Sequence, residues 1–217
     1  MRLEKKIDGA VYYRECPKLD LACGRVLTKK LLQQGFLDFF GVEYLEGQVG
    51  RASGGKPYYG GFLDCAFNVS HCKSGAVAAV SKFQIGVDVE SLRRINSRTV
   101  RSCCNREECV FVFGKPDLET HCGSVLTAQE TKRFLKLWTL KESYVKMTGE
   151  GLRHPLREVC FDVADLKNQR EGTVYRIKGN DACSSSFLLL TENLWIALTV
   201  CSGKNAESVN FRWNPVT

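Results

Sequence analysis

The sequence lacks long apolar runs and is poor in proline, and each shortage excludes a class of protein. With 5 prolines and 19 glycines in 217 residues, the chain cannot form a collagen-like helix. Its longest apolar stretches, such as Phe187–Leu190 and Leu194–Val200, are far too short to span a bilayer. Residues Met1–Gly9 contain no apolar segment of the kind that directs secretion. We therefore expect a cytoplasmic protein with no membrane partner.

Low-complexity tracts, heptad runs and short-period repeats are also absent, so a solenoid is not expected. A hydrophobic content of 44% with 25% charged residues excludes a disordered chain. Lys and Arg number 31 against 24 Asp and Glu, which gives a net charge of +7. This excess suits an anionic partner, which could be a phosphate-bearing ligand, an acidic protein or a nucleic acid.

Cysteine is abundant, with 11 residues, but no Cys-x-x-Cys pair occurs. A disulfide framework is not expected in the reducing cytosol. A zinc site would have to use residues whose spacing matches no standard ligand frame: Cys103, Cys104, Cys109, His121 and Cys122. We expect most cysteines to be small buried hydrophobic residues.

The hydrophobic patterns predict an α+β fold. Strands are expected at Ala10–Tyr13, Ala66–Val69, Ala76–Val80, Ile85–Glu90, Val174–Ile177, Phe187–Leu190 and Trp195–Val200, with a turn at residues 70–75. Helices are expected at Leu21–Gln34, after the capping pair Asn105 and Glu108, and from Ala128 to about Thr148 after the pair Thr127 and Glu130. Because a strand, a long helix and further strands occur twice in this order, we predict two similar halves, residues 1–83 and 84–217.

Two carboxylates occupy the predicted strand Ile85–Glu90. Asp88 and Glu90 point to the same face, about 7 Å apart, and repel by about 2 kcal/mol at an effective dielectric near 20. They could form an ordinary polar outer face. Alternatively, a divalent cation would turn the repulsion into chelation, and hard oxygen ligands suit Mg²⁺. Gly86 permits another backbone to approach closely.

The long predicted helix adds a third carboxylate. Glu142 and Lys146 are four residues apart and share a face with Trp138 and Val145. They could form an i,i+4 ion pair, or the carboxylate could bind a metal and the ammonium a phosphate oxygen. Gly149 is expected to end this helix.

Two shorter motifs have both structural and functional interpretations. His71, after the predicted strand Ala66–Val69, is either a hydrogen-bonded structural residue or a ligand group. The run Gly54–Pro57 is either a simple turn or part of a binding site, and it lacks the frame of a P-loop.

Taken in order, four motifs resemble those of the Sfp-type 4′-phosphopantetheinyl transferases, from about Gly54 to Val200. They are Gly-Lys-Pro at 55–57, Phe-Asn-Val-Ser-His at 67–71, Gly-Val-Asp-Val-Glu at 86–90 and the run from Trp138 to Leu152. The last two are the specific ones. The resemblance implies transfer of the phosphopantetheine arm of coenzyme A to a serine of an apo acyl or peptidyl carrier protein, with release of adenosine 3′,5′-bisphosphate.

The resemblance also implies residue roles. Asp88, Glu90 and Glu142 would hold Mg²⁺, and Glu142 would also be the general base. Lys146 would pair with a phosphate oxygen. Ser70 and His71 would contact coenzyme A phosphates, and His71 would also be a catalytic residue. Lys56 and Pro57 would line the adenine-nucleotide pocket. The implied fold is a pseudo-dimer of α+β halves with the active site in the cleft between them, so we expect a monomer.

The sequence departs from the family pattern in two places. The usual basic segment before the first long helix, which grips the 3′-phosphate of coenzyme A, is short here. The basic residues at hand are Lys5, Lys6, Lys18, Arg25, Lys29 and Lys30. The turn after His71 also looks one residue longer than the common form.

Other hypotheses stay open at this point. The chain could be a non-catalytic relative that binds coenzyme A or a carrier protein, although every acid and base that the chemistry needs is present. It could also be a cysteine-rich zinc module for nucleic acid, but its basic residues are scattered, so we expect no nucleic-acid partner. Arg93 and Arg94 could contact phosphate or could be solvated surface residues.

Overall fold

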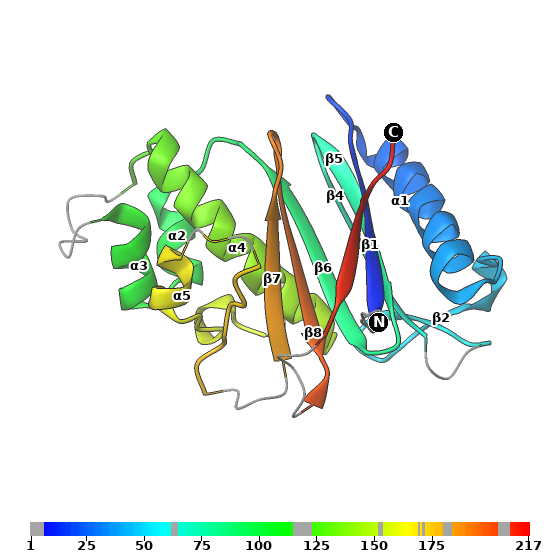
Figure 1. Cartoon of the computed structure of the whole chain (residues 1–217). Coiled ribbons are helices and arrows are strands. Elements are labelled where there is room, and N and C mark those ends of the chain that lie inside the picture. Colours follow the sequence, from blue (N-terminus) through cyan, green and yellow to red (C-terminus); the bar gives the residue numbers. More distant parts are fainter. Residues whose placement is uncertain are drawn as a thin grey trace, which may run out of the picture.

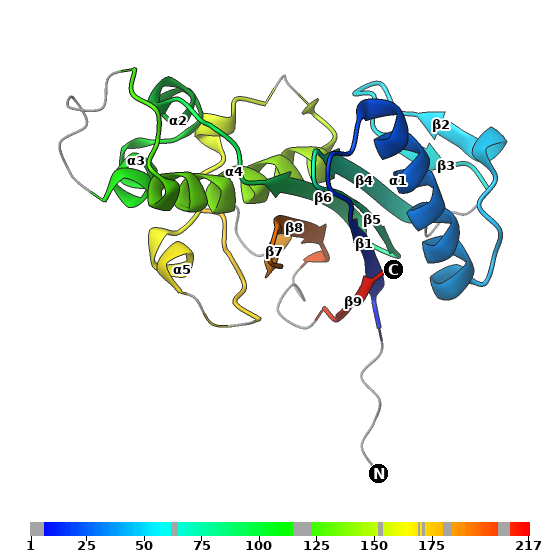
Figure 2. The same ribbon diagram turned by 90° about the horizontal axis from the view of Figure 1, so that it is seen from above.

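Helices flank two sheets that are stacked face to face (Figure 1, Figure 2). The computed structural model describes residues 7–61, 65–114, 123–151, 154–168, 170, 172–179, 184–203 and 209–217. The strands are β1 (Gly9–Glu15), β2 (Val49–Arg51), β3 (Pro57–Tyr59), β4 (Ala66–Cys72), β5 (Gly75–Ser81), β6 (Gln84–Ser91), β7 (Ser184–Leu190), β8 (Leu194–Cys201) and β9 (Phe211–Pro215). The helices are α1 (Leu21–Gly35), α2 (Ser97–Cys103), α3 (Arg106–Phe113), α4 (Ala128–Thr148) and α5 (Val163–Lys167), with short turns η1 (Phe36–Phe40), η2 (Glu46–Gln48) and η5 (Leu156–Glu158). The predicted α+β class is confirmed.

The two main sheets have the strand orders β4-β5-β1-β9 and β6-β8-β7, and β2 pairs with β3 in a small separate ribbon. Side chains alternate between the layers, as the period of a strand requires. On β1, Val11 belongs to the cluster between the sheets, whereas Ala10 and Tyr12 pack against α1. On the other sheet, Ile85 and Ile196 belong to the same cluster between the sheets. The apolar faces of both sheets are thus buried against each other, with α1 and α4 outside them.

A strand, a helix and two strands follow one another in each half of the chain. Residues 9–81 contain β1, α1, β4 and β5, and residues 84–201 contain β6, α4, β7 and β8. Strand β9, from the C-terminal end of the chain, joins the first sheet beside β1 in parallel register. The halves therefore share one sheet edge, and their boundary after residue 83 stays a prediction.

Most predicted elements are present, and their ends have the expected capping residues. Asn105 with Glu108, and Thr127 with Glu130, both form complete capping boxes, and Gly149 ends α4 in a left-handed conformation. The strand predicted at Val174–Ile177 is wrong, because this segment makes only isolated bridges from Tyr175 and Ile177. The turn predicted at residues 70–75 is also shorter, since β4 continues to Cys72.

Some residues named in the sequence analysis lie outside the described residues. They are Lys5, Lys6, His121, Cys122 and Leu152. Among the cysteines of the described part, only Cys103, Cys104 and Cys109 are buried. Cys23 is exposed and five others are partly exposed, namely Cys16, Cys65, Cys72, Cys160 and Cys201, so the expectation that most cysteines are buried is wrong.

Helix α4 lies against β6 with very little space between the two backbones. A Cβ atom added to Gly86 would lie 2.1 Å from the carbonyl oxygen of Ser143 and 2.2 Å from the amide nitrogen of Met147. Beside it, the Ser143 hydroxyl lies 2.7 Å from the hydroxyl of Thr199 on β8. A glycine is therefore required at position 86, as the sequence indicated.

A buried ion pair fixes the opposite side of α4. Lys141 and Glu108 have side-chain exposures of 1% and 0%, and their charged atoms are 2.6 Å apart. Lys141 also donates to the carbonyl oxygens of Cys103 and Leu156, at 2.8 and 2.9 Å. Glu108 accepts from the amide of Phe161. This cluster joins α4 to α2, α3 and η5, and it gives Lys141 a structural role that the sequence analysis did not assign.

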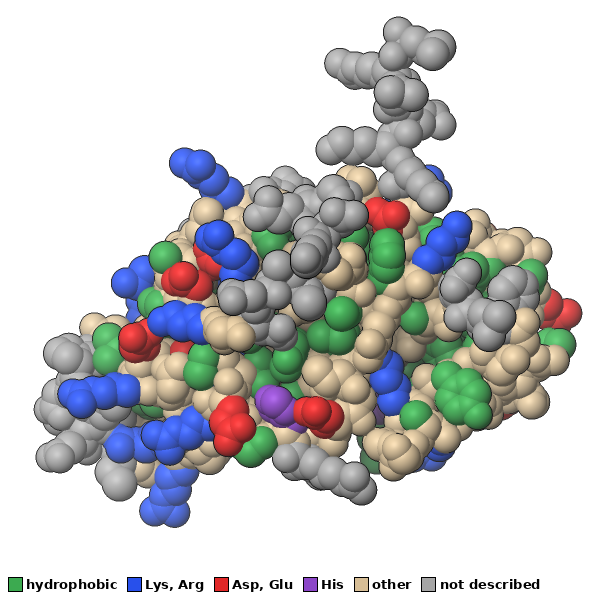
Figure 3. Space-filling model, turned by 90° about the horizontal axis from the view of Figure 1, so that it is seen from below, with side chains coloured by type: hydrophobic (Ala, Val, Ile, Leu, Met, Phe, Trp, Pro, Cys, Tyr) green, Lys and Arg blue, Asp and Glu red, His purple; other side chains and the backbone are tan. Residues whose placement is uncertain are grey.

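On the surface, charged side chains are largely mixed. Seen from below, Lys and Arg are most frequent at the helix-rich left end and are interspersed with acidic side chains (Figure 3). Two ion pairs account for part of this mixture, Lys178 with Glu107 and Arg176 with Asp165. In the part of the chain that the structure describes, no helix is both long and apolar enough to cross a membrane.

Replacing Gly86 by alanine should force α4 away from β6. We expect Gly86→Ala to lower the free energy of unfolding by at least about 2 kcal/mol, because the new methyl group meets backbone atoms that cannot rotate away. Urea denaturation followed by circular dichroism measures the change. Gly47→Ala is the control, since nothing lies within 4 Å of a Cβ at that position. Equal stability of the two variants would contradict this packing.

Removing the Lys141 ammonium should destabilise the protein strongly. Lys141→Met leaves the Glu108 carboxylate buried without its counterion, and we expect a loss of about 3 kcal/mol in thermal or urea denaturation. The control is Lys178→Met, because the pair of Lys178 with Glu107 has exposed side chains, at 45% and 65%, and should contribute under about 1 kcal/mol. A loss below that of the control would show that Lys141 does not hold the helices together.

Candidate active site

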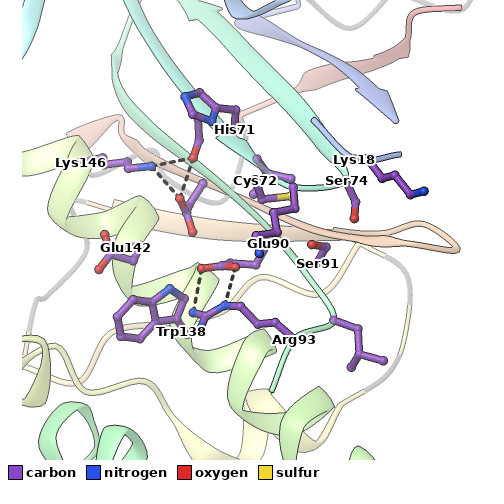
Figure 4. Close-up of a pocket in the computed structure, with 15 residues that line it drawn as sticks. Lys18, His71, Cys72, Ser74, Glu90, Ser91, Arg93, Trp138, Glu142 and Lys146 are labelled. Carbon is purple, nitrogen blue, oxygen red and sulfur yellow. Dashed lines mark hydrogen bonds and ion pairs between the residues drawn. The ribbon is translucent and has the colours of Figure 1, made fainter. Parts of the chain in front are cut away.

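A cavity of about 640 Å³ lies where β4, β6 and α4 meet (Figure 4). It is lined by Lys18, Ser70, His71, Cys72, Lys73, Ser74, Asp88, Val89, Glu90, Ser91, Leu92, Arg93, Trp138, Glu142 and Lys146. The cavity thus brings together six of the eight predicted site residues, and it does not include Lys56 or Pro57. Since β4 belongs to one sheet and β6 to the other, the cavity lies between the two sheets at their shared margin.

Lys146, Asp88 and Ser70 form a closed set of contacts inside the cavity. The Lys146 ammonium lies 2.6 Å from Asp88 Oδ1 and donates to Ser70 Oγ at 2.8 Å. The Ser70 hydroxyl donates to the same Asp88 oxygen at 2.9 Å. Lys146 therefore pairs with Asp88 across the α4–β6 interface, and the i,i+4 ion pair with Glu142 that the sequence allowed is not the one formed.

Asp88 retains one free carboxylate oxygen. The residue as a whole is 5% exposed, and Oδ2 is buried without any hydrogen-bond partner in the described part of the chain. A buried carboxylate oxygen without a partner is costly unless a ligand completes it. Asp88 Oδ2 is therefore an acceptor available to a cation or to a proton donor.

Glu142 lies one helical turn before Lys146 and lines the same cavity. Burial raises the pKa of its carboxyl above the ordinary value of 4.5, and the charge of Asp88 raises it further. The Lys146 ammonium lowers this pKa and Glu90 raises it, so the net shift is upward. Glu142 is thus half-buried beside other carboxylates, and the nearby positive charge of Lys146 does not offset their effect and that of burial.

Glu90 is already paired. Arg93 donates to both of its carboxylate oxygens, from Nε and Nη2, each at 3.1 Å. The Arg93 guanidinium carbon also lies 5.9 Å from the centre of the Trp138 ring. Arg93 therefore lines the cavity, whereas Arg94 is exposed and does not. In Figure 4 the Glu90 carboxylate faces Arg93 and lies apart from the group around Lys146.

His71 lies on the other face of β4 from Ser70, as successive residues of a strand must. Its ring packs against α1 so closely that a Cβ added to Gly24 would lie 2.8 Å from its Cγ. His71 nevertheless borders the cavity, because β4 is the edge strand of its sheet. A ligand lying over this edge would meet Ser70 on one face and His71 on the other.

Lys56 forms hydrogen bonds at the C-terminal end of α4. Its ammonium donates to the carbonyl oxygens of Met147 and Ile85, at 2.5 and 2.9 Å. Burial lowers its pKa from 10.5 to about 8. Pro57 begins β3, next to Lys56. The structure therefore places this pair at the C-terminal end of α4, where Lys56 and Gln84 both donate to the carbonyl oxygen of Met147, one of the last carbonyls of the helix.

The carboxylate oxygens that line the cavity are the type of ligand that a hard divalent cation such as Mg²⁺ prefers. In the described residues, no three His, Cys, Asp or Glu side chains are arranged so that they could hold a metal ion. Two observations nevertheless favour a cation here, namely the free Asp88 Oδ2 and the raised pKa of Glu142. Glu90 could become a third ligand only by exchanging Arg93 for the cation.

Two further lining residues are basic, Lys18 and Lys73. Lys73 was part of a predicted turn, and Lys18 was one of several basic residues near the N-terminus. The segment before α1 approaches the β4–β5 turn only in the folded chain, where Leu19 donates from its amide to the carbonyl of Lys73 at 2.8 Å. No local pattern indicates this contact.

Comparison with known proteins identifies the same region. Residues 84–199, more than half of the chain, match the 4′-phosphopantetheinyl transferase superfamily. Among curated proteins, the chain is 33% identical over 130 residues to a 4′-phosphopantetheinyl transferase of Bacillus subtilis. It is 28% identical over 122 residues to 4′-phosphopantetheinyl transferase gsp of Aneurinibacillus migulanus.

A mouse protein extends the match toward the N-terminus. It is the L-aminoadipate-semialdehyde dehydrogenase-phosphopantetheinyl transferase, 27% identical over 179 residues, which are 80% of this chain and 55% of the mouse protein. The two bacterial matches cover 59% and 56% of this chain, and 52% and 45% of those relatives. The chain thus spans about half the length of the curated relatives that it matches. On the family match over 84–199, this chain belongs to the 4′-phosphopantetheinyl transferase superfamily.

Proposed function

We propose that this chain is a 4′-phosphopantetheinyl transferase. It moves the phosphopantetheine arm of coenzyme A to a serine of an apo acyl or peptidyl carrier protein and releases adenosine 3′,5′-bisphosphate. The observation that carries the proposal is the convergence of Asp88, Glu142 and Lys146 on one cavity, from two elements inside the region that matches the family.

In the proposed reaction the carrier serine oxygen attacks the phosphorus that bears the pantetheine arm. A new oxygen–phosphorus bond forms, and the bond from this phosphorus to the bridging oxygen of the diphosphate breaks. Charge on the diphosphate must be neutralised, and positioning contributes most of the remaining catalysis. Lys146 suits this task, because its ammonium already lies between Asp88 and Ser70 and can turn to a phosphate oxygen.

Glu142 is the proposed general base. Its raised pKa makes the carboxylate a better proton acceptor than an exposed glutamate, and the serine proton would pass to this side chain. Asp88 Oδ2 and Glu142 would hold Mg²⁺, with Glu90 available after release of Arg93. When bound, the ion would supply Lewis-acid stabilisation of the diphosphate charge.

Further roles are proposed for the remaining residues. Ser70 and His71 would contact coenzyme A phosphates from the two faces of β4. Lys56 and Pro57 would contact the adenine nucleotide. For Lys56 this would be a second role, because its ammonium already donates to the carbonyl oxygens of Ile85 and Met147. We further propose that the chain acts as a monomer in the cytoplasm, with its active site between two similar halves and with no nucleic-acid or membrane partner.

The activity is tested by the intact mass of an apo carrier protein incubated with this chain, Mg²⁺ and coenzyme A. We expect a mass gain of one phosphopantetheine arm.

Glu142→Gln should lower the rate by about 10² to 10⁴, as expected for loss of a general base. Asp88→Ala should also be slow and should not be rescued by added Mg²⁺. Lys30→Gln, at an exposed position of α1, is the control. No mass gain with acyl and peptidyl carrier proteins alike would refute the activity.

The pH dependence of stability tests the environment of Glu142 separately. Because its pKa is raised in the folded protein, ionisation of Glu142 costs stability as the pH rises above about 4.5. Glu142→Gln should therefore be more stable than wild type at pH 7, and the difference should vanish near pH 3. Mg²⁺ should raise the melting temperature of wild type more than that of Glu142→Gln. Identical pH profiles would mean that this carboxylate is not strained by its neighbours.

A further inference from the structure

Two cysteines occupy the two ends of a hydrophobic staple at the start of α3. In this motif the residue before the N-cap packs against the fourth residue of the helix. The N-cap of α3 is Asn105, so these two positions are Cys104 and Cys109. Their exposures are 1% and 4%, and both belong to the same core cluster. The local geometry that caps the helix therefore also brings two thiols together.

The two cysteine side chains are in direct contact. The Cys109 thiol is hydrogen-bonded to that of Cys104, and its Sγ lies 3.9 Å from the Cys104 carbonyl oxygen. Both cysteines are free. A disulfide forms without backbone movement only where the two side chains already face each other. The staple meets this requirement for Cys104 and Cys109.

Two arginines act on the Cys109 thiol. Arg101, on α2, has Nε and Nη2 buried without a hydrogen-bond partner in the described part of the chain. The hydrogen bond with Cys104 lowers the pKa of Cys109 below its ordinary value of 9.0, and the charges of Arg101 and Arg157 lower it further, although burial and Glu108 oppose them. The same hydrogen bond and burial raise the pKa of Cys104. Cys109 is therefore the nucleophile of the pair.

We propose that Cys104 and Cys109 are an oxidation site, which hydrogen peroxide converts into a disulfide. The Cys109 thiolate attacks one peroxide oxygen, so that a sulfur–oxygen bond forms, the oxygen–oxygen bond breaks and the first water leaves after taking up a proton. The Cys104 sulfur then attacks the Cys109 sulfur, and the sulfenic oxygen leaves as the second water. In total, two thiols lose two electrons and two protons, and one peroxide is reduced to two waters.

The exposed Cys23 provides the opposite case. The hydrogen bond to Asp20 and the charge of that carboxylate raise the pKa of its thiol, so Cys23 is accessible but a poor nucleophile. Cys104 and Cys109 are buried, but hydrogen peroxide is little larger than water. In the folded protein we therefore expect a bulky alkylating reagent to modify Cys23 and peroxide to oxidise the buried pair.

The disulfide would lie beside the ion pair that holds α4. Glu108, next to Cys109, contacts the Lys141 ammonium at 2.6 Å, and the carbonyl of Cys103 accepts from the same ammonium at 2.8 Å. A disulfide restricts the unfolded chain and leaves these contacts in place. The oxidised protein should therefore be more stable than the reduced protein.

The test is peptide mapping of the full chain by mass spectrometry, after hydrogen peroxide treatment and alkylation in denaturant. We expect cross-linked peptides that join residues 104 and 109, with a loss of two hydrogen atoms that dithiothreitol reverses, at a peroxide concentration that leaves Cys23 reduced. The melting temperature should rise on oxidation. Cys104→Ala should stop at a sulfenic acid on Cys109, which dimedone traps. Cys103→Ala and Cys23→Ala are the matched controls and should form the same disulfide.

Three results would overturn the assignment. They are oxidation of Cys23 before the pair, oxidation of Cys109 without the cross-link in wild type, and a cross-link that lowers the melting temperature, since the last would mean that the thiols are not placed for bonding. If Cys104→Ala does not fold, the wild-type peptide map and melting temperature still decide, because neither needs a variant.

Discussion

The close contact between α4 and β6 is the constraint on which the site depends. Gly86 allows the helix backbone to reach the strand, and no other residue fits there without displacing α4. The helix then holds Lys146 within 2.6 Å of Asp88, two residues further along β6. A helix only slightly farther from the strand would lose both this ion pair and the half-buried setting of Glu142. The positions of the charged side chains in the cavity therefore depend on an uncharged packing contact, the one between α4 and Gly86.

The cavity concentrates like charges that the fold does not fully compensate. Asp88 has one partner-free oxygen, Glu142 has a raised pKa, and Glu90 is neutralised by Arg93. Such an arrangement lowers the stability of the empty protein, and a bound cation or phosphate ligand would recover part of that free energy. Uncompensated charge is therefore expected where a protein must bind a charged substrate, and it distinguishes this cavity from the paired charges elsewhere on the molecule.

Three lysines near or on α4 illustrate how position decides the use of one side-chain type. Lys141 is fully buried with Glu108 and joins helices. Lys56 satisfies carbonyls at the end of α4, and burial lowers its pKa to about 8. Lys146 alone is half-buried at the cavity, where its ammonium can exchange a carboxylate for a phosphate. All three residues have the same side chain, so the differences between their roles come from how exposed each ammonium group is and which partners it contacts.

Local sequence determined the elements and the identity of the acids, and only the tertiary structure decided how they are combined. The capping pairs before α3 and α4, the alternation on β6 and the need for Gly86 all follow from periodicities and steric limits within a few residues. The segment at Val174–Ile177 is apolar enough for a strand, but it forms only isolated bridges, from Tyr175 to Ser186 on β7 and from Ile177 to Phe161. The partner of Lys146, the burial of Lys141 and the approach of Lys18 to Lys73 depend on contacts between residues far apart in the chain. Those contacts are set by the packing of whole layers, which no local pattern encodes.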